Sequence, residues 1–210
     1  MKTDKLIDAL VTDRATRASL GRSLVGALVA GGLVSLVVFL ATLGIRPDIE
    51  PALATWRFDL KIVLVLVALA LAFGFCLAVS RPTATGREAL RLLPLAALAT
   101  IAVGIEVVVL PGAAWANRLI GSNALVCLCA IPLFSAAPLV AVLAILRTGA
   151  PASPTLAGAA AGLLAATAGA ALYAFHCFDD SPLFVVTWYS LAAMPVVLLG
   201  AFAGRRFLRW

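Results

Sequence analysis

The sequence is poor in charged residues. Only 12% of its 210 residues are Asp, Glu, Lys or Arg, whereas a soluble domain carries about 25%. In contrast, 63% of the residues are hydrophobic and the mean hydropathy is +1.10. A chain with so few charges cannot cover itself with a polar surface, so lipid must be the solvent for much of it. The composition therefore excludes an ordinary soluble domain.

The groups that common enzymes use are scarce as well. There is one His, and the sequence has no H-E-x-x-H, P-loop, G-x-S-x-G or C-x-x-C motif. The polar N-terminal segment, residues 1–22, is too short to form a soluble enzyme domain. We therefore expect a protein that is not an enzyme and has no permanent cofactor. A thiol oxidoreductase in particular would need a C-x-x-C motif or a recognisable quinone site.

Six apolar runs predict an all-α, six-helix membrane protein. Each run is near the ~20 residues that a bilayer demands, and Pro, Gly and charged residues separate them. The fifth run is rich in Ala and Gly, which lets neighbouring backbones approach closely, so we expect it inside the bundle. The predicted domains are an N-terminal segment, 1–22, and a transmembrane domain, 23–210, with helices at 23–44, 61–79, 92–111, 122–146, 157–175 and 183–203.

The distribution of Lys and Arg predicts the orientation. Of the 16 basic side chains, 12 fall on one side of the predicted membrane, together with both termini. Basic loops stay in the cytoplasm, so both termini are predicted to be cytoplasmic. The basic residues flank apolar runs, which indicates a topology signal and no direct contact with nucleic acid. The four on the predicted outer side are Arg46, Arg57, Lys61 and Arg118.

The N-terminal segment has the pattern of a short amphipathic helix. Its apolar stripe is predicted to have an acidic flank beside it. One interpretation is a helix that lies on anionic lipid, held by the later arginines. The other is a docking helix for a cytoplasmic partner. The stripe consists of Leu6, Ile7, Leu10 and Val11, and the acidic flank of Asp4 and Asp8.

The predicted topology also gathers reactive side chains near the outer surface. Thiol, imidazole and carboxylate groups together suit a soft or borderline metal ion, and two thiols suit a reversible disulfide. An ionisable residue within an apolar run, such as Glu106, indicates function by default. The members of this predicted cluster are Glu106, Cys127, His176, Cys177, Asp179 and Asp180.

Structural interpretations of the same residues stay open. Asp179 and Asp180 could serve the turn before Pro182, and Glu106 could pair with Arg118 or a neighbour. Cys129 lies about 200° around the helix from Cys127, so the two cannot face one partner. Cys76 is expected to be a small buried residue.

Several stretches resemble the NrsF-type family of six-span membrane anti-sigma factors, which are negative regulators of an extracytoplasmic-function sigma factor. They are M-K-T-D-K-L-I-D-A-L at 1–10, W-R-F-D-L-K at 56–61, C-L-C-A-I-P-L at 127–133 and H-C-F-D-D-S-P-L-F at 176–184. The resemblance covers essentially the whole chain. It implies a protein of the bacterial inner membrane whose two characteristic cysteines, corresponding to Cys127 and Cys177, sense heavy metal or oxidant.

On this resemblance the N-terminal segment would bind the sigma factor, and a transient heavy-metal ion or an oxidant at the cysteines would release it. The alternative hypothesis is a small metal-ion or metabolite transporter, with Glu106 lining the pathway. A transporter should carry polar groups through the whole bilayer, whereas the predicted inner halves of these helices have almost none.

Overall fold

The structure, a computed structural model, describes residues 20–208. These residues form helices joined by short turns, without a β-strand. Six helical segments are long and apolar enough to cross a membrane, as the sequence predicts. They are α2 (Leu20–Thr42), α4 (Trp56–Val79), η1 with α5 (Arg87–Leu92 and Leu93–Val109), α7 (Ala124–Leu146), α8 (Pro154–Tyr173), and α9, η3 and α10 (Pro182–Phe184, Val185–Tyr189 and Ser190–Phe207).

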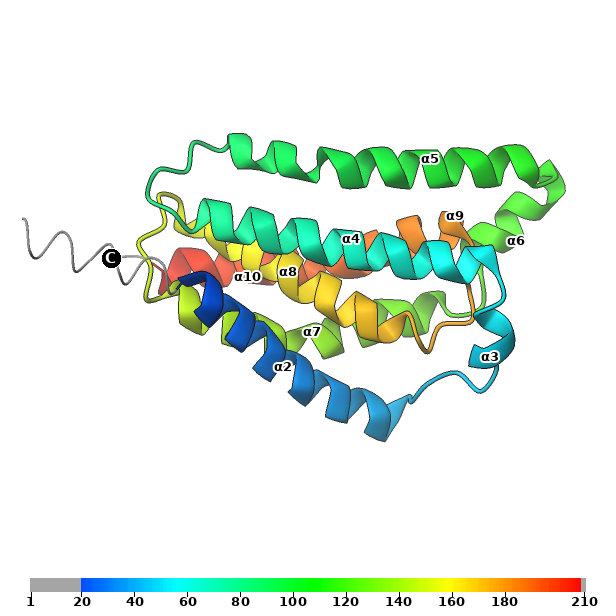
Figure 1. Cartoon of the computed structure of the whole chain (residues 1–210), viewed down its shortest axis with the longest axis horizontal. Helices are drawn as coiled ribbons and strands as arrows, with labels where there is room; N and C mark the ends of the chain where they lie inside the picture. The colour runs from blue at the N-terminus through cyan, green and yellow to red at the C-terminus, as the bar shows by residue number, and fades with distance from the viewer. Residues whose placement is uncertain (1–19, 209–210) are drawn as a thin grey trace, which may run out of the picture.

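The six segments run alternately up and down, so the start of α2 and the end of α10 lie at the same end of the bundle (Figure 1). We call this the Leu20 end. The opposite end, here called the Cys177 end, carries the short helices α3 (Ile49–Ala52), η2 (Gly112–Ala114) and α6 (Trp115–Ile120) and the loop formed by residues 174–181. Which end faces the cytoplasm remains a prediction from charge.

The observed helix starts differ from the predicted ones by a few residues: α2 begins at Leu20, within the predicted segment 1–22, and at α4 and α8 a cap extends the helix beyond the apolar run. α4 begins five residues before the predicted start, since the Thr55 side chain accepts a hydrogen bond from the backbone N–H of Phe58 (3.4 Å). α8 begins at Pro154, because Ser153 caps it in the same way through Leu156 (3.3 Å). The earlier start of α4 places Lys61 in its second turn.

The fifth span, α8, lies at the centre of the bundle, as predicted. Of its most apolar stretch 61% is buried, against 11% for the span that contains α5. Its contact with α10 is a seam of glycines: Gly158 and Gly162 on α8 meet Gly200 and Gly204 on α10. A Cβ on Gly162 would lie 2.6 Å from the carbonyl oxygen of Val196, so the two backbones can touch only without side chains.

α2 packs on α7 around a proline in the latter helix. Pro138 has no N–H, so it cannot donate to the carbonyl of Phe134 four residues earlier. The hydroxyl of Ser35 on α2 donates to that carbonyl instead (2.6 Å). Gly31 allows the close approach, because a Cβ there would lie 2.6 Å from the Cα of Pro138. Phe39 adds an edge-to-face contact with Phe134.

We predict that Gly162→Ala destabilises the protein although Ala is the better helix former. The added methyl group would push α8 away from α10, and overpacking of this kind costs about 1–3 kcal/mol. The measurement is unfolding of the detergent-solubilised protein by SDS. Gly104→Ala is the matched control, because no atom lies within 4 Å of its Cβ position. It should be neutral or slightly stabilising, and an equal loss in both variants would contradict the packing argument.

Candidate functional site

The loop of residues 174–181, here called the Cys177 loop, meets two buried cations. Arg46 (6% exposed) and Lys61 (0% exposed) both pair with Asp180. The Arg46 Nη1 atom lies 3.0 Å from Asp180 Oδ2. Both cations also donate to the backbone carbonyl of Cys177, Arg46 at 3.1 Å and Lys61 at 2.8 Å. We call Arg46, Lys61 and Asp180 the buried ion-pair cluster.

Further contacts hold the Arg46 guanidinium. It donates two hydrogen bonds of 2.7 Å to the carboxylate of Asp48 and lies over the ring of Phe178, 4.9 Å from its centroid. The hydrogen-bonded Arg46 holds the pKa of Asp48 below its usual value, and Asp48 in turn raises the pKa of Arg46. Arg46 therefore stays charged at any physiological pH.

Asp179 caps the start of α7 from a distant part of the chain. Its Oδ2 atom accepts hydrogen bonds from the backbone N–H groups of Ser122 (2.9 Å) and Asn123 (2.8 Å) and from the Asn123 side chain (3.1 Å). A carboxylate at this position satisfies free N–H groups and complements the helix dipole. Asp179 thus fixes the Cys177 loop to the helix that carries Cys127.

Glu106 is fully buried near the end of α5 and has two partners. Its Oε2 lies 3.3 Å from Arg57 Nε, and its Oε1 accepts a hydrogen bond from the Ser181 hydroxyl (3.1 Å). The partner considered from the sequence, Arg118, is exposed on α6. The intramembrane acid therefore joins α4, α5 and the end of the Cys177 loop.

Cys127 and Cys177 lie in one buried cluster. Both side chains are 0% exposed and both thiols are free. The cluster also contains Tyr173, Phe184 and Tyr189. The predicted convergence of these two residues is thus present, whereas Cys129 is exposed and Cys76 is buried in another cluster.

Burial controls the reactivity of Cys177. It raises the pKa of the thiol, and the ammonium group of Lys61 opposes that rise. The thiol donates weakly to the carbonyl of Asp179 (3.7 Å). Because the thiolate is the reactive species, an unperturbed Cys177 loop keeps this residue largely unreactive.

The other predicted ligands have partners of their own. The His176 Nδ1 atom is 3.1 Å from the carbonyl of Gly44, and Asp179, Asp180 and Glu106 are held as described above. Within residues 20–208, no group of three or more His, Cys, Asp and Glu side chains is placed to hold a metal ion.

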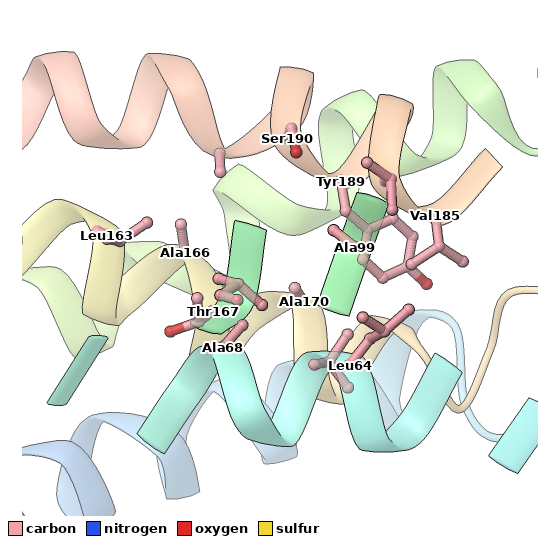
Figure 2. A pocket seen from close by; sticks show the side chains of 14 residues that line it. Leu64, Ala68, Ala99, Leu163, Ala166, Thr167, Ala170, Val185, Tyr189 and Ser190 are labelled. Carbon is pink, nitrogen blue, oxygen red and sulfur yellow. The ribbon is translucent and has the colours of Figure 1, made fainter. Parts of the chain in front are cut away.

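A cavity of about 150 Å³ lies between α4, α5, α8 and α10. Figure 2 shows Ala68, Ala99, Thr167 and Tyr189 among the side chains that line it. No charged side chain lines this cavity, and the hydroxyl of Tyr189 has no hydrogen-bond partner. The cavity offers the hydroxyl groups of Thr167, Tyr189 and Ser190 but no charged ligand for an ion, so it gives no particular support to the transporter hypothesis.

Sequence reasoning missed the residues that hold the loop in place. Arg46, Lys61 and Arg57 were predicted only to lie on the outer side, and although Arg57, Lys61 and Ser181 stand in stretches that resemble the family, no role was predicted for them or for Ser122. The signal that could have found Lys61 is its position within the second turn of a capped helix. The predicted docking residues Asp4, Leu6, Ile7, Asp8, Leu10 and Val11 lie outside the described residues.

Comparison with known proteins identifies the family to which the chain belongs. The sequence model of the family described as "Negative regulator of sigma F", NrsF, matches residues 10–210. The chain belongs to this family. It is 34% identical to the "Anti-sigma-F factor NrsF" of Caulobacter vibrioides (strain NA1000 / CB15N) and 29% identical to the "Probable anti-sigma-F factor NrsF" of Azospira oryzae (strain ATCC BAA-33 / DSM 13638 / PS), over the whole length of each chain. No solved structure matches this NrsF family member.

We predict that Asp180→Asn strongly destabilises this NrsF protein. The substitution leaves Lys61 buried without its carboxylate, and breaking a buried pair in this way costs about 3–5 kcal/mol. SDS unfolding in mixed micelles measures the loss. Asp59→Asn, at an exposed position in the first turn of α4, is the control and should change stability by less than about 1 kcal/mol. Similar losses in both variants would contradict a special role for Asp180.

We also predict unequal reactivity of the cysteines towards N-ethylmaleimide. Cys129 lies on the outer surface of the apolar helix α7, where this uncharged reagent can reach it through the detergent, so at neutral pH it should be modified at least roughly tenfold faster than Cys127 and Cys177, which protein encloses. Mass spectrometry of digests at timed intervals gives the rates. The rate at Cys177 should rise with pH above the range of an ordinary thiol, because its pKa is raised. Modification of Cys177 as fast as Cys129 would contradict the buried, protonated thiol.

Proposed function

We propose that this protein is an anti-sigma factor of the bacterial inner membrane, which holds an extracytoplasmic-function sigma factor and releases it under thiol-reactive stress. The observation that carries the proposal is the family match over residues 10–210, together with full-length similarity to a relative named as an anti-sigma-F factor. The partner is a sigma factor, and the protein itself makes no direct contact with nucleic acid.

The N-terminal segment is the proposed docking element. In this proposal Leu6, Ile7, Leu10 and Val11 supply the apolar anchors, as an amphipathic helix does in a groove. Asp4 and Asp8 pair with basic residues on the sigma factor, whose surfaces for DNA are expected to be basic. Both chain termini lie in the cytoplasm, where a sigma factor is found.

Cys127 and Cys177 form the proposed sensor. A soft metal ion would replace the two thiol protons and bind both sulfurs as thiolates. An oxidant would instead join the sulfurs: the two thiols give up two electrons and two protons, and one molecule of hydrogen peroxide takes them to form two waters. Both reactions draw Cys177 towards Cys127 on α7. Their shared burial in one cluster supports this proposal.

The deciding test is recovery of the sigma factor with the tagged protein, before and after cells are exposed to cadmium, dichromate or peroxide. The wild-type protein should retain the sigma factor in unstressed cells and lose it on exposure. Cys127→Ser and Cys177→Ser should retain it under both conditions, because serine neither forms a disulfide nor binds a soft metal ion well. Response to cadmium alone would identify metal binding, and response to peroxide alone would identify oxidation.

Cys129→Ser and Cys76→Ser are the matched controls, since neither residue belongs to the cluster of Cys127 and Cys177. Both should release the sigma factor as the wild type does. Normal release from either sensor variant would refute the sensor, and failure to recover any sigma factor from unstressed cells would refute the anti-sigma function.

A further inference from the structure

The proposed docking element lies in residues 1–19, which precede α2 in the sequence, so α2 is the described helix nearest to it along the chain. The bundle holds α2 near its middle through Gly31 and Ser35, which meet α7 at Pro138 and Phe134. Gly31 lies eleven residues from each end of the helix. At 1.5 Å per residue, each arm is about 16 Å long.

At the Cys177 end, α2 diverges from the rest of the bundle (Figure 1). The chain that leaves it is tied back by contacts with the Cys177 loop. The carbonyl of Gly44 meets the His176 ring, and the backbone N–H of Arg46 donates to the carbonyl of Phe175 (3.1 Å). The Arg46 side chain donates to the carbonyl of Cys177 and pairs with Asp180.

We infer that Arg46 is the positioning residue that carries the state of Cys177 to α2, and through α2 to the N-terminal docking element. This inference rests on the proposed function and names the route by which its sensor acts. The guanidinium bonds the backbone carbonyl of Cys177 itself, so a backbone movement at this residue moves the acceptor atom. A shift of about 1 Å takes a 3.1 Å hydrogen bond out of bonding range.

Loss of this bond would loosen the chain that ties back the divergent arm of α2, while Phe39 still packs on Phe134. The contacts at Gly31 and Ser35 then act as a pivot, because close-packed backbones resist separation more than rotation. Movement of one arm therefore produces an opposite movement of the other, at the Leu20 end. Leu24, which packs there in a cluster with Leu146 and Leu208, would leave its site, and the docking element would move with it.

Arg118 provides a matched control for Arg46. It is also an arginine at the Cys177 end, but it is exposed on α6. In unstressed cells we expect Arg46→Gln to lower sigma-factor recovery roughly tenfold, which is within the usual range of coupling between sites. Arg118→Gln should leave recovery unchanged. Arg46→Lys keeps the charge but cannot reach Asp48, Asp180 and the Cys177 carbonyl together, so it should lower recovery by a smaller factor.

The order of action is tested by the double variant Arg46→Gln/Cys177→Ser. Cys177→Ser alone should retain the sigma factor under stress. If Arg46 acts after Cys177, the double variant loses the sigma factor as Arg46→Gln does. If it retains the sigma factor as Cys177→Ser does, the inference is wrong. Equal amounts of each variant in the membrane fraction, and an effect of Arg46→Lys in the same direction, separate this result from simple loss of the fold.

A second measurement does not depend on the sigma factor. Hydrogen–deuterium exchange of the purified wild-type protein is compared before and after oxidation by diamide, which takes two electrons and two protons from the thiols and becomes a hydrazine. Exchange should rise at residues 44–48 and also at residues 20–26. In Arg46→Gln both segments should exchange fast from the start, without further response.

A rise at residues 44–48 without a rise at residues 20–26 would overturn the coupling through α2 and leave the proposed sensor intact. Failure to recover a sigma factor from wild-type cells would refute the proposed function, while the exchange result still decides whether Cys177 and the start of α2 are coupled.

Discussion

The structure depends most on the burial of two cations against one short loop. Lys61 is fully buried and Arg46 nearly so, and each would be costly in an apolar surrounding without a partner. Asp180 and the backbone carbonyl of Cys177 each contact both cations and offset the cost of burying their charges. Because the same loop also caps α7 through Asp179 and bonds Glu106 through Ser181, one stretch of chain ties together α2, α4, α5 and α7. The conformation of the loop is thereby determined from several sides.

This arrangement encloses two thiols within a closely packed bundle. The thiols of Cys127 and Cys177 are buried, and the raised pKa of Cys177 keeps it protonated and slow to react. The surrounding ion pairs are strong but few in number, and each has a defined geometry. A reaction at the thiols therefore acts on a small set of contacts, and the tightly packed glycine seam between α8 and α10 can remain unchanged.

Much of the architecture could be predicted from the sequence, because six apolar runs, separated by Pro, Gly and charged residues, are strong signals of membrane-spanning helices. The central position of α8 followed from its small residues, and the separate surroundings of Cys127 and Cys129 followed from helical geometry. Helix starts could not be predicted as well, since the caps at Thr55 and Ser153 lie outside the apolar runs. The partners of Glu106 and Asp180 were not accessible either, because tertiary packing alone decides which charges meet.

The ion pair between Lys61 and Asp180 also bears on how the protein is made. The two residues are separated by 119 positions, and the Cys177 carbonyl lies 116 positions after Lys61. While α4 enters the bilayer, the groups that compensate Lys61 have yet to be synthesised. Until the loop between α8 and α10 has been synthesised, Lys61 therefore lacks the groups that compensate its charge. The last two spans therefore complete the polar contacts of α4, and a chain that stopped before residue 177 would leave Lys61 without either partner.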